Sequence, residues 1–155
     1  MNRHARHTAV SCGVALVAAL FAQAGSATST PSAPVPPAVA GKGHVVRVYY
    51  FHTTQRCSSC KKIESFADEA IRSGFASEIE DGKLEWVVVN LDEAANQHFV
   101  SDYKLYTKSL VVVDSTDGLQ TRWKNLEKIW ELVMQKEKFY DYVQDEVRSY
   151  LTASP

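Results

Sequence analysis

Proline is scarce in this chain, and its distribution separates two regions. Four of the five prolines lie within residues 31–37, and the fifth is Pro155. The stretch from residue 38 to residue 154 therefore contains no proline. Residues 28–43, where the four prolines stand among Ser, Thr and Ala, have the composition of a stiff linker with no core of its own.

An excess of one charge and a glycine-rich loop are also missing. The 17 Lys and Arg side chains nearly balance the 18 Asp and Glu side chains, and both signs are interspersed along the chain. No basic stripe indicates a nucleic-acid partner. The seven glycines form no phosphate-binding loop of the kind that holds a flavin or a dinucleotide. Nothing in the composition indicates an oligomeric state.

The N-terminal residues have the pattern of a secretory signal. Arg3 and Arg6 precede a small and apolar run over residues 8–22, and small residues at 22–27 offer a cleavage point. The apolar run is shorter than the roughly 20 residues that a membrane span needs. We expect residues 1–27 to direct export to the periplasm and to be removed there. An uncleaved signal, the alternative, would tether the chain to the membrane.

Cysteine is scarce too, with three in the chain. Cys12 lies inside the predicted signal, so the mature protein keeps only Cys57 and Cys60. A bond between cysteines this close in sequence closes a small loop, and it stabilises little through loop entropy. We therefore interpret the C-x-x-C pair as chemical rather than structural.

The remaining residues, 44–152, have the size of one domain and predict alternating strands and helices. Residues 44–51, 84–91 and 110–113 are apolar runs typical of strands, and an Asp117-Gly118 turn joins the third to residues 119–123. The patterns also predict helices from Ser58 to Gly74, from Asp92 to Tyr103, over 126–134 and over 137–151. The expected fold is α/β, with a mixed central sheet, flanking helices and the order β-α-β-α-β-β-α.

The two mature cysteines directly follow the first predicted strand and open the first predicted helix. The unpaired N–H groups and the positive dipole end of a helix favour a thiolate. The pKa of Cys57, at or just before the first turn, should lie below the usual thiol value of about 8.5, whereas Cys60 is shielded one turn inside. We expect Cys57 to attack and Cys60 to resolve the mixed disulfide. Arg56, Lys61 and Lys62 add positive charge around the pair.

The order of the predicted elements resembles the thioredoxin superfamily. It consists of a strand, a C-x-x-C helix, a strand ending in Val-Val-Asn-Leu-Asp-Glu, a Tyr-containing helix and a hairpin. The segments YYFHTTQRCSSCKKIE, WVVVNLDE, HFVSDYKLYTKS and RWKNLEKIWELV also resemble a bacterial family named nitrophenyl compound nitroreductase subunit. The likeness covers nearly all of residues 44–152 and implies a thioredoxin-like fold with a redox-active dithiol. Nitro reduction itself would need a flavin or a similar two-electron carrier.

Two positions depart from the thioredoxin pattern. The cis-proline of that superfamily falls on Ser109, with Lys108 before it. In thioredoxins this proline helps to bind the substrate backbone and keeps metals away from the cysteines, so a trans Ser109 would alter both functions. The dipeptide Ser58-Ser59 replaces Gly-Pro between the cysteines. Since that dipeptide tunes the redox potential in the superfamily, the potential of this chain stays open.

Two further side chains are candidates for supporting roles. His52, at the end of the first predicted strand, can stabilise the thiolate or join a metal site; the alternative is a hydrogen-bonded polar residue at the sheet edge. Glu64 stands four residues after Cys60 and can relay its proton; the alternative is an ion pair with Lys61 or a solvent-facing position.

The leading interpretation is a thiol–disulfide oxidoreductase whose redox-active disulfide serves in place of a cofactor. Its partners would be protein thiols and disulfides and a membrane redox protein, and its redox direction is open. One alternative is a metal-binding module for an iron–sulfur cluster, zinc or copper(I), with Cys57, Cys60 and His52 as candidate ligands. A third interpretation is a redox-inert subunit that only docks on a partner.

Overall fold

The structure, a computed structural model, describes residues 43–153. The predicted signal at 1–27 and the linker at 28–43, apart from Gly43, lie outside this range. The described elements, in chain order, are β1 (His44–His52), α1 (Ser58–Gly74), α2 (Ala76–Glu80), β2 (Leu84–Asn90), the 3₁₀ helix η1 (Ala94–Asn96), α3 (His98–Asp102), β3 (Ser109–Thr116), β4 (Leu119–Asn125), α4 (Ile129–Leu132) and α5 (Lys136–Thr152). Within this part of the chain, none of the helices combines the length and the apolar character that a membrane crossing requires.

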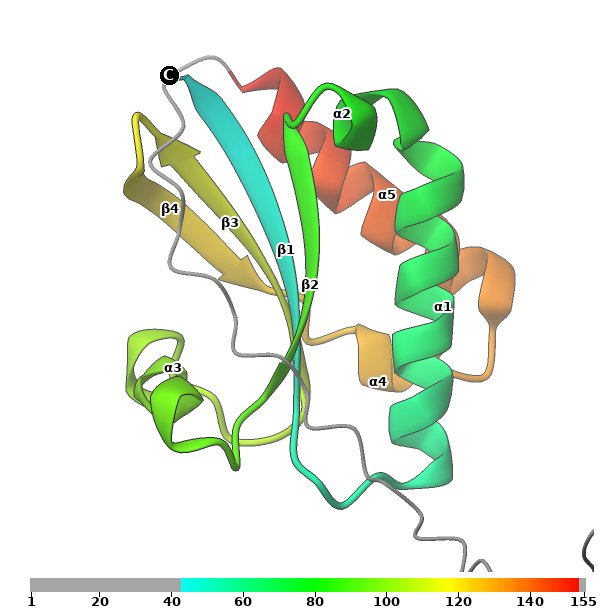
Figure 1. Cartoon of the computed structure of the whole chain (residues 1–155). Coiled ribbons are helices and arrows are strands. Elements are labelled where there is room, and N and C mark those ends of the chain that lie inside the picture. Colours follow the sequence, from blue (N-terminus) through cyan, green and yellow to red (C-terminus); the bar gives the residue numbers. More distant parts are fainter. Residues whose placement is uncertain (1–42, 154–155) are drawn as a thin grey trace, which may run out of the picture. The chain divides into compact units, whose positions relative to one another are not determined.

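The strands form one mixed sheet in the order β2-β1-β3-β4. The central strand β1 runs parallel to β2 and antiparallel to β3, and β4 is antiparallel to β3. Helices α1, α4 and α5 lie on one side of the sheet and α3 lies on the other (Figure 1). This arrangement confirms the predicted α/β class and the thioredoxin-like fold.

Both faces of β1 are covered, and alternate residues of the strand enter two separate cores. Val48 and Tyr50 pack with apolar residues of α1 and α5, whereas Tyr49 and Phe51 pack with Tyr103 after α3. Since successive side chains of a strand point to opposite faces, a strand covered on both faces needs a continuous apolar run. The sequence VVRVYYF is apolar except for Arg47, whose buried side chain is paired with Glu85 of β2, and this composition fits the central place of β1 in the sheet.

The β3–β4 hairpin is confirmed and is longer than predicted. Asp117 and Gly118 both have positive φ, of 52° and 80°, as a two-residue turn of type I′ requires. Strand β3 begins at Ser109 and β4 continues to Asn125. Most residues of β4 face solvent and are polar, so the apolar pattern of the sequence does not show the full length of this strand.

The helix predicted from Asp92 to Tyr103 is wrong. This segment contains η1 and the short α3 instead. The Asp92 carboxylate accepts a hydrogen bond from the backbone N–H of Thr54, at 2.8 Å, rather than capping a helix of its own. The buried Asn96 amide bonds the carbonyl of Asn90, at 3.0 Å, and holds the segment against the end of β2.

Candidate functional site

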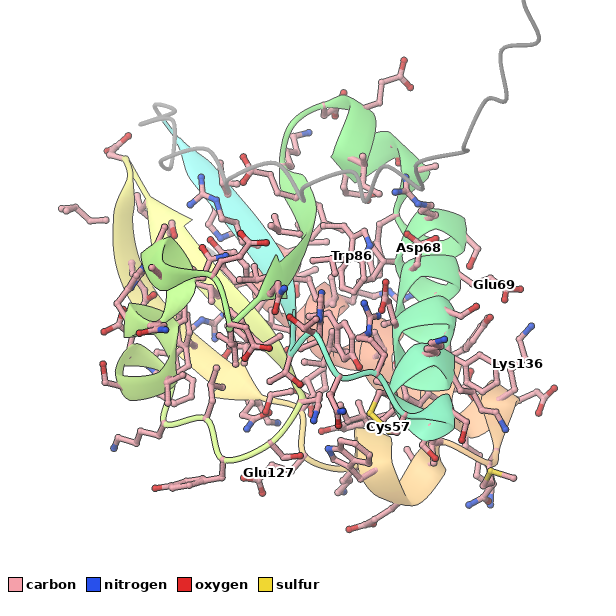
Figure 2. The ribbon with its side chains drawn as sticks, turned by 60° about the horizontal axis from the view of Figure 1, so that its bottom comes forward. Cys57, Asp68, Glu69, Trp86, Glu127 and Lys136 are labelled. Carbon is pink, nitrogen blue, oxygen red and sulfur yellow. A yellow bond between two sulfur atoms is a disulfide. The ribbon has the colours of Figure 1, made fainter. Side chains whose placement is uncertain are left out.

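Cys57 and Cys60 form a disulfide where the chain enters α1. Cys57 is the N-cap of this helix, with extended backbone angles of −77° and 164°, and its Sγ accepts a hydrogen bond from the N–H of Cys60 at 3.1 Å. Figure 2 shows Cys57 at the first turn, beside the loop that arrives from β1. The geometry therefore aims a helix N–H and the positive end of the helix at this sulfur.

The two sulfurs differ in their access to solvent. Cys57 is exposed, whereas only 2% of Cys60 is exposed. The buried Tyr50 donates its hydroxyl hydrogen bond to the Cys60 carbonyl at 2.7 Å, which ties the first turn of α1 to the central strand. An incoming sulfur can therefore reach Cys57 but not Cys60.

The loop before Cys57 is bound to the end of β2. Thr54 donates its backbone N–H to Asp92, and its hydroxyl accepts a hydrogen bond from the Asn90 side chain at 3.2 Å. The Thr54 N–H is the main reason why the pKa of Asp92 lies below its ordinary value, so the carboxylate stays ionised. This anchoring role of Asp92 was missed because an Asp after a strand also fits a helix cap.

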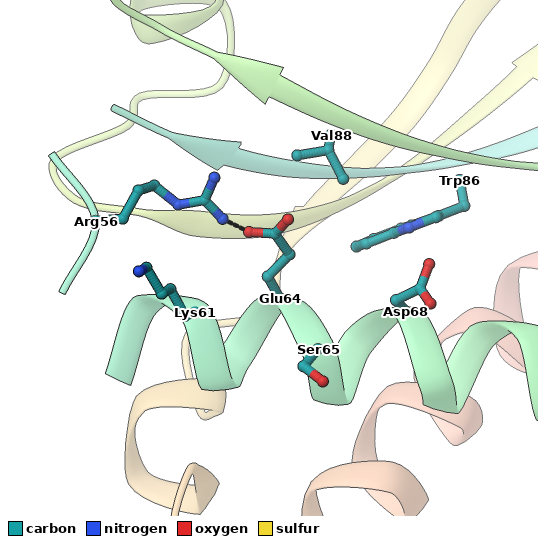
Figure 3. A pocket seen from close by; sticks show the side chains of 7 residues that line it. All are labelled: Arg56, Lys61, Glu64, Ser65, Asp68, Trp86 and Val88. Carbon is teal, nitrogen blue, oxygen red and sulfur yellow. Dashed lines mark ion pairs between the residues drawn. The ribbon is translucent and has the colours of Figure 1, made fainter. Parts of the chain in front are cut away.

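Arg56 and Glu64 form an ion pair across the entrance to α1 (Figure 3). Their side chains are 23% and 28% exposed, so the pair is partly shielded from solvent. It lines a groove of about 440 Å³ between α1 and β2, together with Lys61, Ser65, Asp68, Trp86 and Val88. Glu64 is thus paired with the residue before Cys57 rather than with Lys61.

His52 lies at the end of β1, with its ring between the loop and Arg56. Its Nδ1 is 2.9 Å from the Thr53 carbonyl oxygen, which can only accept, so Nδ1 carries the hydrogen. Nε2 then faces the Arg56 guanidinium at 3.4 Å. Burial, aided by the positive charge of Arg56, lowers the pKa of His52 below its ordinary value and keeps the ring neutral.

The donor set near the disulfide, as the structure describes it, is short of the four ligands of a tetrahedral or iron–sulfur centre, whereas copper(I) would need only the two thiolates. Within residues 43–153, no three His, Cys, Asp or Glu side chains gather in the way a metal ion needs. The two sulfurs are bonded to each other, and the free nitrogen of His52 faces a cation. A tetrahedral site takes four ligands, so a second chain would have to supply the rest.

Lys108 and Ser109 approach the disulfide from the start of β3. Lys108 lines a hollow of about 450 Å³ together with Cys57, Arg56, Gln55 and Thr54. Its carbonyl accepts a hydrogen bond from Trp130 Nε1 at 3.1 Å, which fixes the backbone there. Ser109 is buried opposite Phe51 of β1, and its hydroxyl donates to the Thr107 carbonyl at 2.9 Å. The structure thus places Lys108, but not the Ser109 side chain, beside Cys57.

Comparisons with known proteins found similar solved structures only. No protein-family model and no curated protein matches the chain. Oxidised thioredoxin O2 from Arabidopsis thaliana is 14% identical over 62% of this chain and 76% of its own, with a TM-score of 0.38. A mutant thioredoxin from Halobacterium salinarum is 20% identical over 71% and 78%, with a TM-score of 0.42. Thioredoxin from Trypanosoma brucei brucei is 17% identical over 71% and 80%, with a TM-score of 0.40. The fold assignment itself rests on the order and direction of the strands.

Proposed function

We propose that this protein is a thiol–disulfide oxidoreductase that works outside the cytoplasm, with Cys57 as the attacking and Cys60 as the resolving cysteine. The observation that carries the proposal is the disulfide at the N-cap of α1, with one sulfur exposed and the other buried. The signal-like N-terminus supports the location, because disulfide exchange on protein substrates is typical of oxidising compartments.

The reaction exchanges two electrons and two protons with a substrate. In the reducing direction the Cys57 thiolate attacks a substrate disulfide, a Cys57–substrate bond forms, and the departing substrate sulfur takes up a proton. Cys60 then loses its proton and attacks Cys57 Sγ, which releases the second substrate thiol and leaves the Cys57–Cys60 disulfide. In the oxidising direction each step is reversed, starting from a substrate thiolate that attacks the exposed Cys57.

The chain's own residues support the first half of this exchange. The Cys60 N–H, already within hydrogen-bond distance of Cys57 Sγ, stabilises a thiolate there more strongly than a thiol. The hydrogen bonds that Tyr50 donates to the Cys60 carbonyl and that the Thr54 N–H donates to Asp92 hold the helix turn and the loop in place, and neither bond involves a sulfur atom. A membrane redox protein would return Cys57 and Cys60 to the working state. The resemblance to the nitrophenyl compound nitroreductase subunit family supports a role as the subunit that carries the dithiol and exchanges electrons with this membrane redox protein.

Mixed-disulfide trapping tests the proposal. With dithiothreitol as the reductant, the purified protein should reduce insulin, and Cys57→Ser should abolish the reaction. Cys60→Ser should accumulate one covalent adduct per chain at Cys57, seen by mass spectrometry. A redox-inert subunit would keep its function in cells with both cysteines replaced. Stoichiometric metal or visible absorbance in the isolated protein would favour a binding module. The proposal would be overturned if the protein failed to reduce insulin and either kept its function without both cysteines or was isolated with stoichiometric metal or visible absorbance.

A further inference from the structure

Lys108 lines two hollows, and Cys57 lines only one of them. The first is the hollow shared with Cys57. The second, of about 550 Å³, is also lined by Lys108 and includes Leu91, Val100, Leu105 and Tyr106. Because both hollows share Lys108, a bound chain that reaches Cys57 can extend past the lysine into the second hollow.

Two exposed apolar side chains line the second hollow. Tyr106 is 95% exposed and Val100 is 42% exposed, and they are two of the four large apolar side chains that the described residues expose. Exposed apolar side chains that gather beside a reactive group are typical of binding surfaces rather than of scattered surface residues. Tyrosine suits this position, since its ring offers a large contact area at a low cost in side-chain entropy.

Lys108 and Arg56 both line the hollow that contains Cys57, and they differ in their partners. Arg56 is bound by Glu64, whereas no Asp or Glu among the described residues lies within ion-pair distance of Lys108. Asp92 lines the second hollow as well, and the charge of Lys108 contributes to its lowered pKa, but its carboxylate accepts the Thr54 N–H and forms no ion pair with Lys108. A substrate carboxylate would therefore meet a cation whose charge is not already paired.

We propose that Lys108 selects polypeptide substrates that carry an acidic residue next to the reacting cysteine, and that the Tyr106 hollow accepts a large apolar side chain of the same substrate. This inference rests on the proposed function, because the substrate reacts at Cys57 in the way described above. Two contacts on one extended segment, one charged and one apolar, would fix its register so that its sulfur lies at Cys57.

Peptide disulfides that differ at one position test the charge contact. The substrates share one sequence, with Glu, Gln or Lys next to the reacting cysteine, and kcat/KM is measured with dithiothreitol as the reductant. The Glu peptide should react about fivefold faster than the Gln peptide, which corresponds to about 1 kcal/mol, the upper range for a partly exposed ion pair. Lys108→Glu should reverse the order of the Glu and Lys peptides.

Matched variants and a neutral substrate separate the possible failures. Lys83→Glu makes the same change of charge at the opposite end of the sheet, before β2, and should leave the peptide order unchanged. The unaltered protein should have a higher kcat/KM for a peptide with Trp two residues from the reacting cysteine than for the same peptide with Ala there. Tyr106→Ala should reduce this ratio about fivefold. Equal rates for the Glu and Lys peptides with the unaltered protein, or an unchanged order in Lys108→Glu, would overturn this inference. No reaction even with the small neutral disulfide of 2-mercaptoethanol would instead overturn the proposed function.

Discussion

Replacing Glu64 with Gln should lower the pKa of the Cys57 thiol. In the structure the Glu64 carboxylate neutralises the Arg56 guanidinium one residue before Cys57. Glutamine can still accept a hydrogen bond from Arg56 and keep it in place, but the negative charge is gone. The sulfur then experiences an uncompensated cation, which favours the thiolate.

The size of the change follows from the partial exposure of the pair. The pair is partly shielded but Cys57 is exposed, so an effective dielectric of about 40, between the value of about 20 near a protein surface and that of water, is appropriate. A unit charge one to two helical turns from the sulfur, on the order of 7 Å, then changes the free energy of the thiolate by about 1 kcal/mol. Screening by salt reduces this further, so the pKa of Cys57 should fall by about 0.5 to 1.

Alkylation rates against pH, measured in a Cys60→Ser background, give the pKa of Cys57 directly. Arg56→Gln should raise this pKa by a similar amount, and the double variant with Glu64→Gln should return it close to the starting value. Asp68→Asn is the matched control, because Asp68 lines the same groove but pairs with Arg72. A rise of the Cys57 pKa in Glu64→Gln would refute the reasoning. An unchanged pKa with slower attack by Cys60 would identify Glu64 as a proton relay instead.

Three further changes test the contacts of β1 and of the two ends of α1. Burial holds the pKa of His52 below its ordinary value of 6.5, so the unfolded chain takes up the proton first as pH falls. The free energy of unfolding should therefore decrease below about pH 6.5. Urea unfolding at pH 7.5 and pH 5 should show a smaller decrease in the free energy of unfolding for His52→Gln than for the unaltered protein. Alanine at Gly74 would bring its Cβ to 2.7 Å from Gln144 Nε2. Because this displaces the Gln144 amide from a carbonyl of α1, the free energy of unfolding should fall by about 1 kcal/mol, and by much less in a Gln144→Ala background. Tyr50→Phe removes the hydrogen bond to the Cys60 carbonyl and should also cost about 1 kcal/mol in urea unfolding of the oxidised protein, with an unchanged alkylation pKa of Cys57 in the Cys60→Ser background.

The elements with strong local signals could be predicted from the sequence. Strand β1 is β-branched and aromatic except for Arg47 and its two end histidines, α1 has apolar residues at helical spacing up to Gly74, and Asp117-Gly118 is a dipeptide typical of a two-residue hairpin turn. Since Cys57 stands between the first two elements, its place at the start of the helix followed from the same patterns.

The tertiary contacts between separate elements could not be predicted from the sequence. Local spacing makes Lys61 the natural partner of Glu64, yet the loop before α1 folds back and brings Arg56 to it. An Asp after a strand predicts a helix cap, yet the Thr54 N–H from another loop binds Asp92 first. In both cases the competing partner is distant in sequence or lies outside the helix, so no periodic pattern indicates it.

Arg56 and Lys108 lie beside Cys57 from different elements, and their different partners imply different effects on catalysis. Glu64→Gln changes the nucleophile, so it should change the rate with the neutral disulfide of 2-mercaptoethanol, and since it also leaves Arg56 unpaired beside Cys57, it should not slow an acidic peptide relative to that disulfide. Lys108→Glu changes the contact with the substrate, so it should slow the acidic peptide about fivefold more than the neutral disulfide. Equal factors for both substrates in both variants would mean that the charges around Cys57 act as one field, and the division between thiolate activation and substrate selection would then be wrong.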